Sequence, residues 1–264
     1  MIRTLPSDDV WKKVEAIFPG KGGGRGRTAT DNCCLLEAVL WLGGTGRPWH
    51  DLPAEFGRRH TAYMRISRWR RKGVWSGVAL AMAGEIEIDH ILSDTASERA
   101  HHHSAGASKL GPQAIGRSQG GLITKRYLVV DGAGRLLRLI MTERQVHDIS
   151  CAKELVEHLC PKAVFADKDD DDSDAFVDAV RAIGAEVIIP PRSNRKSKRR
   201  YSRTLHRTRN VVERFFNRIK HFRRVSTRYD KLADSYLVIV SLTVEDSTGR
   251  YNSLMESFSW CIGV

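Results

Sequence analysis

Residues 121–142 read GLITKRYLVVDGAGRLLRLIMT and contain the pattern that decides the fold class. Two apolar runs rich in Leu, Ile and Val flank the turn sequence Asp131-Gly132-Ala133-Gly134. Runs of this kind around a glycine-containing turn are typical of a β-hairpin. The stretch therefore predicts two antiparallel strands near the middle of the chain.

The segments on both sides of this hairpin predict more of the same sheet. Residues 86–94 have strand composition, and two short apolar runs, 163–167 and 185–190, are typical of buried strands. Helical patterns at 150–160 and 174–184 separate them. Strands that alternate with helices imply a mixed sheet flanked by helices, so we expect an α/β fold from about residue 85.

The N-terminal third carries only helical patterns. Residues 5–18 predict a short helix, and a second begins after Thr30 or Asp31. A third, 61–72, turns Tyr63 and Ile66 inward and a basic face outward. Its arginines include Arg65 and Arg68, and a short turn before a basic helix resembles a helix-turn-helix reader of DNA. A solvated basic face fits these residues equally well.

The composition change near Gly84 predicts two domains. We expect an all-helical DNA-binding domain at 1–84 and an α/β domain at 85–264, with an unusual tail from about 243. The chain has no apolar run long enough to cross a bilayer and no signal-peptide pattern, and its five cysteines lack zinc-site spacing. We expect a cytoplasmic protein without a membrane partner.

Positive charge is concentrated in residues 191–228, which hold fifteen Lys or Arg and one acid, Glu213. The whole chain has a net charge of +12 and an isoelectric point near 9.7, so the remainder of the sequence is slightly acidic. Clustered cations predict a polyanion partner, because neutralised phosphates release counterions. Within 205–224 a helical pattern aligns Glu213 with three groups, His206, Arg209 and Lys220.

Three acids are candidates for a metal site. Asp94 and Asp167 each lie near the end of a predicted strand, and Glu213 lies in the basic helix that follows. If the two strands are neighbours, their carboxylates converge at one edge of the sheet. Three carboxylates suit Mg²⁺ or Mn²⁺, which can assist phosphodiester cleavage. A structural ion pair is the alternative reading of Glu213.

Several longer motifs match one known family. They include DNCCLLEAVLWLGGTGRPWHDLP (31–53), SDTASERAHHHSAGA (93–107), AIGRSQGGLITK (114–125) and RNVVERFFNRIKHFRRVSTRYDKL (209–232). Through these motifs the chain resembles bacterial insertion-sequence transposases with a DDE site, of the four/five superfamily. The resemblance implies a ribonuclease-H-like catalytic domain behind a small helical DNA-binding domain. It also implies a bacterial, nucleoid-associated protein.

The resemblance also implies roles for individual residues. Asp94, Asp167 and Glu213 match the catalytic and metal-binding triad, with Mg²⁺ as cofactor and Mn²⁺ as an alternative. The superfamily's last signature is matched at Arg209 and Lys220, while His206 stands where the family has Tyr. Beyond that signature, the resemblance and the charge together indicate DNA contacts at Arg223 and Arg224.

The implied reaction involves double-stranded DNA. The enzyme binds the inverted-repeat ends of its own element, cuts them with a metal-activated water and joins the freed 3′-hydroxyl to target DNA. A homodimer or higher oligomer is expected in the active complex. A catalytically inactive DNA-binding remnant is the alternative, because an acidic run at 169–172 replaces the family's usual residues after Asp167. A calcium loop is a further reading of that run, although it lacks the loop's Gly and final Glu.

Overall fold

The computed structural model describes residues 8–20, 31–83, 88–106, 112–143, 151, 154–166, 174–188, 217 and 219–261. At 94, 174, 175 and 249–261 it describes the backbone alone. The chain divides into two compact units, which are treated separately below. The first contains residues 1–84, 103–112 and 219–264, and the second contains 85–102 and 113–218.

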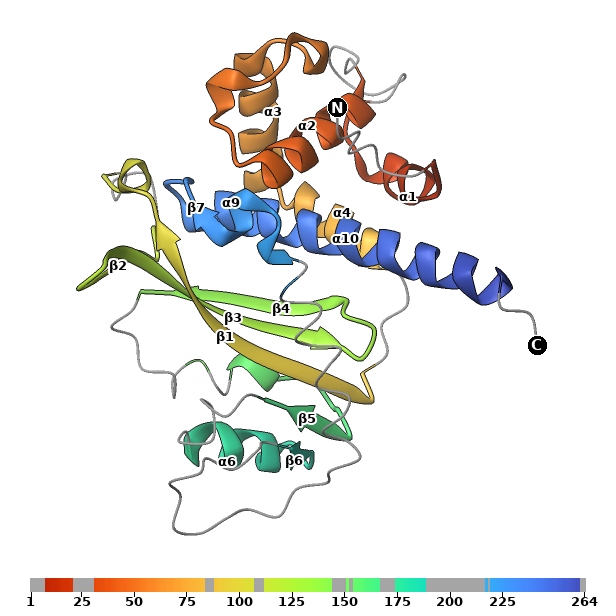
Figure 1. Ribbon diagram of the computed structural model, residues 1–264, viewed down its shortest axis with the longest axis vertical. Helices are drawn as coiled ribbons and strands as arrows, with labels where there is room; N and C mark the ends of the chain where they lie inside the picture. Colours follow the sequence, from red (N-terminus) through yellow and green to blue (C-terminus); the bar gives the residue numbers. More distant parts are fainter. Residues whose placement is uncertain are drawn as a thin grey trace. The chain divides into compact units, whose positions relative to one another are not determined.

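The first unit is helical (Figure 1). Its N-terminal elements are α1 (Asp8–Val14), η1 (Glu15–Ile17), α2 (Asn32–Thr45), η2 (Trp49–Asp51), η3 (Ala54–Phe56), α3 (Arg59–Arg71) and α4 (Val74–Ala83). Its C-terminal elements are α9 (Arg223–Ser226), β7 (Thr227–Arg228) and α10 (Ala233–Cys261). The carboxylate of Asp31 caps α2 by accepting from the Cys34 amide at 3.0 Å, as its sequence position predicts.

The core of the helical unit joins the two ends of the chain. Apolar side chains of α2, including Leu36 and Val39, pack in one cluster with Trp75 of α4 and with Ile239 and Leu242 of α10. Figure 1 shows α10 running alongside α4. Ile239 and Leu242, which the sequence assigned to the domain from residue 85 onward, therefore lie in the core of the helical unit.

Two glycines of α2 allow this packing. A Cβ at Gly43 would lie 2.4 Å from Oγ1 of Thr243, so the missing side chain lets α2 and α10 approach closely. Gly46 ends α2 with a φ of 67° in the left-handed region, where its amide donates to the Leu42 carbonyl. A Cβ there would lie 2.8 Å from Cβ of Arg223. Gly46 therefore ends α2, whereas Gly43 lies within the helix.

The second unit is built on a mixed sheet. Its strands are β1 (His90–Ala100), β2 (Gly116–Ser118), β3 (Gly121–Asp131), β4 (Leu136–Thr142), β5 (Ala163–Phe165) and β6 (Glu186–Ile188), and α6 (Asp174–Ala182) packs beside them. The strand order is β2-β3-β1-β5-β6, with β4 also paired to β3. The predicted hairpin is confirmed as β3 and β4, and its turn is held by Asp131, which accepts from the amides of Ala133 and Arg135.

The direction of pairing changes at β1. On one side β1 runs antiparallel to β3, and on the other it runs parallel to β5, which in turn runs parallel to β6. One face of this sheet packs Ile91, Tyr127 and Val164 against Phe176 and Val180 of α6. The expected mixed sheet flanked by helices is therefore confirmed, with β1 as its central strand.

Candidate functional site

The sheet unit contains the first candidate acid. The sequence placed Asp94 near the end of a strand, but β1 continues to Ala100, so Asp94 lies in the middle of β1, opposite Leu128 of β3. Asp167 and Glu213 lie outside the described residues, as do His206 and Arg209. Three carboxylates are hard oxygen ligands of the kind that Mg²⁺ and Mn²⁺ prefer, so the donor set fits the metal that the sequence predicts.

The strand that precedes the second candidate acid, Asp167, is β5, the parallel partner of β1. In the parallel β1–β5 pair, Leu92 is the register partner of Phe165. Asp94 comes two residues after Leu92, and Asp167 comes two residues after Phe165. The predicted convergence of the two carboxylates required these strands to be neighbours, and β1 and β5 are neighbours in the sheet.

A buried ion pair lies on the same strand as Asp94. Arg126 of β3 donates from Nη2 to Oε1 of Glu98 at 2.8 Å, and the two side chains are 0% and 9% exposed. The other two guanidinium nitrogens of Arg126, Nε and Nη1, are buried without a hydrogen-bond partner among the described atoms of the chain. Neither residue was among the sequence-predicted site residues, because their proximity depends on the strand register.

Two neighbouring histidines, His101 and His102, directly follow β1. The rings of His101 and His102 lie 4.1 Å apart between centroids, tilted by 36°. η4 (His102–Ser104) begins at His102, where the chain leaves the extended conformation of β1, and the two rings lie together at this change of direction.

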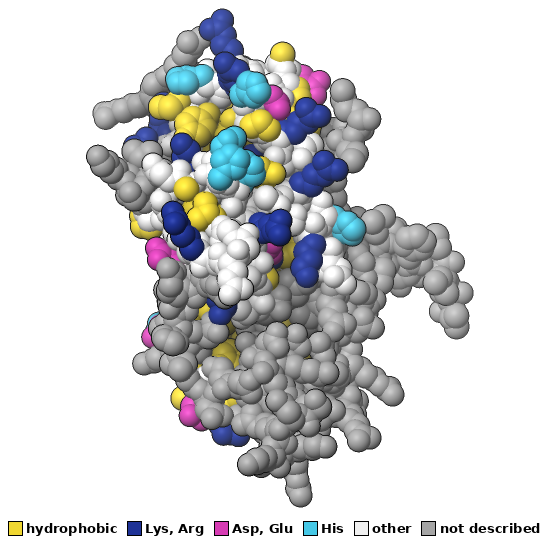
Figure 2. Space-filling view, turned by 60° about the vertical axis from the view of Figure 1, so that its left-hand side comes forward, with side chains coloured by type: hydrophobic (Ala, Val, Ile, Leu, Met, Phe, Trp, Pro, Cys, Tyr) yellow, Lys and Arg dark blue, Asp and Glu magenta, His cyan; other side chains and the backbone are white. Residues whose placement is uncertain are grey.

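In the helical unit, α3 presents the predicted basic face. Its buried stripe is Ala62, Ile66 and Trp69, while Arg68 and the flanking cations are exposed. Figure 2 shows dark blue Lys and Arg and cyan His side chains gathered on the upper part of one face. Tyr63, which the sequence placed in the core, is 49% exposed and meets the edge of Trp49 instead.

The two arginines predicted to contact DNA from α3 differ in their surroundings. The guanidinium of Arg65 lies 4.9 Å from the centre of the Trp69 ring and donates to Oδ1 of Asn32. Burial lowers the pKa of Arg65, which nevertheless stays positively charged at neutral pH. Arg68 points to solvent. Arg65 therefore ties α3 to the start of α2, and Arg68 is the one available at the surface.

The cations of the C-terminal segment also divide into two kinds. Lys220 and Arg223 are exposed. Arg224 is 2% exposed and donates from Nε and Nη2 to the two carboxylate oxygens of Asp230 at 2.9 and 2.8 Å. Its Nη1 donates to the Arg47 carbonyl at 2.8 Å. These contacts use its guanidinium inside the fold, so Arg224 is removed from the set proposed to contact DNA.

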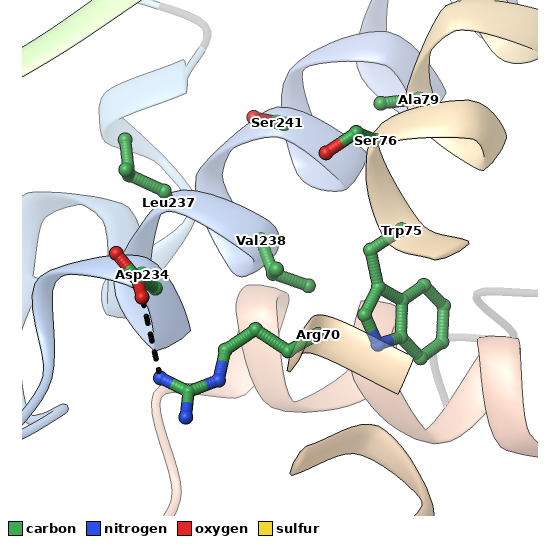
Figure 3. A pocket seen from close by; sticks show the side chains of 8 residues that line it. All are labelled: Arg70, Trp75, Ser76, Ala79, Asp234, Leu237, Val238 and Ser241. Atoms are coloured by element: carbon green, nitrogen blue, oxygen red, sulfur yellow. Dashed lines mark ion pairs between the residues drawn. The ribbon is translucent and has the colours of Figure 1, made fainter. Parts of the chain in front are cut away.

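The helical unit also has a small pocket between α4 and α10. It encloses about 240 Å³ and is lined by Arg70, Trp75, Ser76, Ala79, Asp234, Leu237, Val238 and Ser241 (Figure 3). Arg70 donates from Nη1 to Oγ of Ser235 at 3.1 Å and lies 3.9 Å from a carboxylate oxygen of Asp234. This contact links α3 to α10. Within the described part of the chain, no helix is long and apolar enough to cross a membrane.

The chain belongs to the DDE transposases of the IS4/5 family. Residues 87–244 match the "Transposase DDE domain" and residues 7–79 match the "Putative transposase of IS4/5 family". DDE transposases are enzymes that cleave and join DNA with divalent metal ions, and the domain match implies a ribonuclease-H-like fold for the mixed sheet.

Proteins of two bacteria are similar to this chain. An "Uncharacterized protein y4sN" of Sinorhizobium fredii is 32% identical over 39% of this chain and 82% of its own length. An "Insertion element IS402 uncharacterized 16.2 kDa protein" of Burkholderia cepacia is 30% identical over 38% of this chain and 76% of its own length. The "Putative transposase for insertion sequence element IS402" of the same species is 28% identical over 52% of this chain and 67% of its own length.

Proposed function

We propose that this chain binds the ends of its own insertion element, cleaves the DNA there and joins the freed 3′-hydroxyl to target DNA. The cofactor of this reaction is Mg²⁺, held by Asp94, Asp167 and Glu213. Each element has two ends, so we propose a homodimer or higher oligomer as the active complex.

One observation carries the catalytic part of this proposal. Leu92 and Phe165 are register partners in adjacent parallel strands, and the two aspartates follow them at the same distance of two residues. Parallel strands carry equivalent positions side by side. We infer from this equivalence in the sequence that the two aspartates serve one metal site, since open α/β sheets bind ligands beyond the carboxyl side of such strand pairs.

The chemistry of these residues supports hydrolysis and strand transfer. When bound, the divalent cation lowers the pKa of water and stabilises charge on the leaving oxygen. The three carboxylates hold the cation, and the basic side chains of the protein hold the DNA backbone. We assign backbone contacts to Arg68, His206, Arg209, Lys220 and Arg223, with Arg65 placing α3. Phosphate contacts position a duplex, and contacts to base edges select its sequence.

The test is cleavage of a duplex that carries an element end from the DNA flanking the gene. Wild type should bind and nick this duplex with Mg²⁺, while Asp94→Asn and Glu213→Gln should bind it equally well and leave it intact. Both substitutions keep the side-chain shape and remove a negative charge.

The other outcomes decide between the alternatives. Equal cleavage by wild type and Glu213→Gln would refute the catalytic role of Glu213, and a lower melting temperature would then favour its structural ion pair. Binding without cleavage by any of the proteins would identify an inactive DNA-binding remnant. Cleavage of random duplexes at the same rate would indicate a nuclease without end preference.

A further inference from the structure

The exposed charges of α3 form two groups along the helix. Exposed cations stand at its start and at its end, and the helix contains no acid. The first group is Arg58 and Arg59, and the second is Arg68, Arg71 and Lys72. A rise of about 1.5 Å per residue places Arg59 and Arg71 about 18 Å apart along the helix axis.

The exposed positions between these two groups carry no Lys, Arg, Asp or Glu. They are His60, Thr61, Tyr63 and Met64. Tyr63 and Met64 are 49% and 38% exposed, although both side chains are large and hydrophobic. Arg65, the cation of this stretch, is half-buried against Trp69. A helix face with cations at both ends and neutral groups in the middle is complementary to a groove of duplex DNA, where two phosphate backbones flank the base edges.

Met64 lies at the centre of this exposed face. The helical period of about 3.6 residues places it nearly opposite the buried stripe of α3. Arg68 and Arg71 follow it by four and seven residues, on the same side of the helix. Tyr63 differs from Met64, because its ring meets the edge of Trp49 at a centroid distance of 5.5 Å. Met64 is thus the apolar side chain that α3 presents to the partner of its cations.

The thioether of Met64 can recognise one feature of the base edges. In the major groove the base pairs present hydrogen-bond donors and acceptors, and the C5-methyl of thymine is the apolar group among them. A methionine has no donor, and its sulfur is only a weak acceptor, so it cannot read the polar groups. Its unbranched side chain adapts well to an apolar contact. The thymine methyl is therefore the group in the groove that suits Met64.

We propose that Met64 is a specificity-determining residue that contacts thymine methyl groups in the major groove of the element ends. The cations at both ends of α3 hold the phosphates on either side. This role rests on the proposed function, because it assumes that the chain binds those ends. A length of about 18 Å corresponds to about five base pairs at about 3.4 Å each, so the contacted thymines lie within one such stretch.

The test replaces thymine by deoxyuridine, which pairs with adenine in the same way and lacks the methyl group. Binding of the full chain to element-end duplexes, each with a single replaced thymine, is measured by fluorescence anisotropy at one fixed salt concentration. For wild type, Kd should rise about fourfold at one or two thymines within that stretch, the factor that the burial of one methyl group gives. Met64→Ala should bind all of these duplexes with equal affinity.

Leu80 provides a matched control. This side chain is 65% exposed on α4, a helix of the same unit that contains no charged residue. Leu80→Ala should discriminate between thymine and deoxyuridine as wild type does. Both Ala variants should keep the wild-type melting temperature, because both side chains are exposed. If Met64→Ala melts at a lower temperature, Met64→Gln keeps the length of the side chain and should also lose the discrimination.

Three results would overturn the role of Met64. Equal wild-type affinity for every duplex would show that the protein contacts no thymine methyl. An equal loss at every replaced thymine would indicate a change in the duplex itself. Discrimination that persists in Met64→Ala would show that another residue reads the methyl group. In each case binding to the element end would remain. Wild type that binds an element end no better than a random duplex would instead refute the proposed function, and the base contact of Met64 with it.

Discussion

Two basic segments of the helical unit, α3 and residues 220–231, differ in how deeply the fold buries their cations. In α3 the cations Arg68 and Arg71, like Lys72 just after the helix, are exposed, and the buried stripe is apolar. In the C-terminal segment Arg224 and Arg228 are 2% and 0% exposed. Positive charge in a sequence therefore indicates a surface for DNA only where the fold leaves the side chains at the surface.

The difference follows from local structure. In α3 the helical period separates the apolar stripe from the arginines. In the C-terminal segment the chain turns at His221 and Phe222, forms the short α9 and reaches Asp230, an acid six residues after Arg224. Arg224 also satisfies the carbonyl of Arg47, just beyond the end of α2.

The largest expected effect is on stability, at Arg224. Arg224→Ala leaves the carboxylate of Asp230 buried without its cation, and breaking a buried pair in this way costs about 3–5 kcal/mol. Chemical denaturation would measure the change in the free energy of unfolding. The matched control is Arg223→Ala, at an exposed neighbour, which should change the free energy of unfolding by about 0.5 kcal/mol or less. Equal losses of unfolding free energy in the two variants would contradict the contrast between the buried Arg224 and the exposed Arg223.

The next effect is on DNA binding, at α3. Arg68→Ala with Arg71→Ala should flatten the slope of log affinity against log salt by about one unit for each phosphate that the protein no longer neutralises. Melting temperature should not change, because both side chains are exposed. Lys12→Ala with Lys13→Ala removes the same charge from exposed positions of α1 and serves as the control. If the control flattened the slope equally, general charge and not the α3 surface would account for binding.

A smaller effect is expected at Arg65, which combines features of both segments. Arg65→Ala removes a cation–π interaction with Trp69 and a hydrogen bond to Asn32, so the free energy of unfolding should fall by about 1–2 kcal/mol. DNA affinity should fall less than for Arg68→Ala, as measured at one fixed salt concentration. A fall in affinity with unchanged stability would move Arg65 to the DNA-contacting group.

The smallest effect concerns the titration of the Cys33 thiol. Cys33 follows Asn32, the residue of α2 that accepts a hydrogen bond from Arg65. Burial and the nearby Glu37 raise the pKa of the Cys33 thiol from 9.0 to about 11. The neutral thiol is favoured in the fold, so its contribution to stability is full below pH 9 and is lost as pH rises through about 11. Alkylation of Cys33 should be slow at pH 8 and accelerate toward pH 11, with exposed Cys160 as the reference. Rapid alkylation of Cys33 at pH 8 would contradict the raised pKa of its thiol.

Local patterns predicted the sheet well. The Asp-Gly-Ala-Gly turn indicated the β3–β4 hairpin, and apolar runs indicated β5 and β6, since each signal lies within a few residues. The 3.6-residue period likewise predicted α3, with an error at Tyr63, because Ala62 rather than the larger aromatic residue faces the core. The separate helix α4 was missed, because its apolar run lacks polar residues that would define a period.

Features that depend on distant residues could not be predicted. The buried Arg224 bonds to the carbonyl of Arg47, 177 residues earlier, and the contact between Arg126 and Glu98, 28 residues apart, depends on the register of β1 and β3. The sequence predicted that the basic helix continues to residue 224. In the structure a turn at His221 and Phe222 interrupts it before α9. The catalytic assignments of Asp94, Asp167 and Glu213 remain predictions from the motifs and the family resemblance.

The division of the helical unit between the two ends of the chain has a consequence for biosynthesis. Ile239 and Leu242 of α10 complete the core formed by α2 and α4, so this core stays open until the ribosome has released the last part of the chain. The sheet unit, encoded in between, is synthesised earlier. A prematurely terminated chain would therefore leave the apolar faces of α2 and α4 exposed to chaperones and proteases. Degradation of such chains would keep unfinished copies of the protein from occupying the ends of the element.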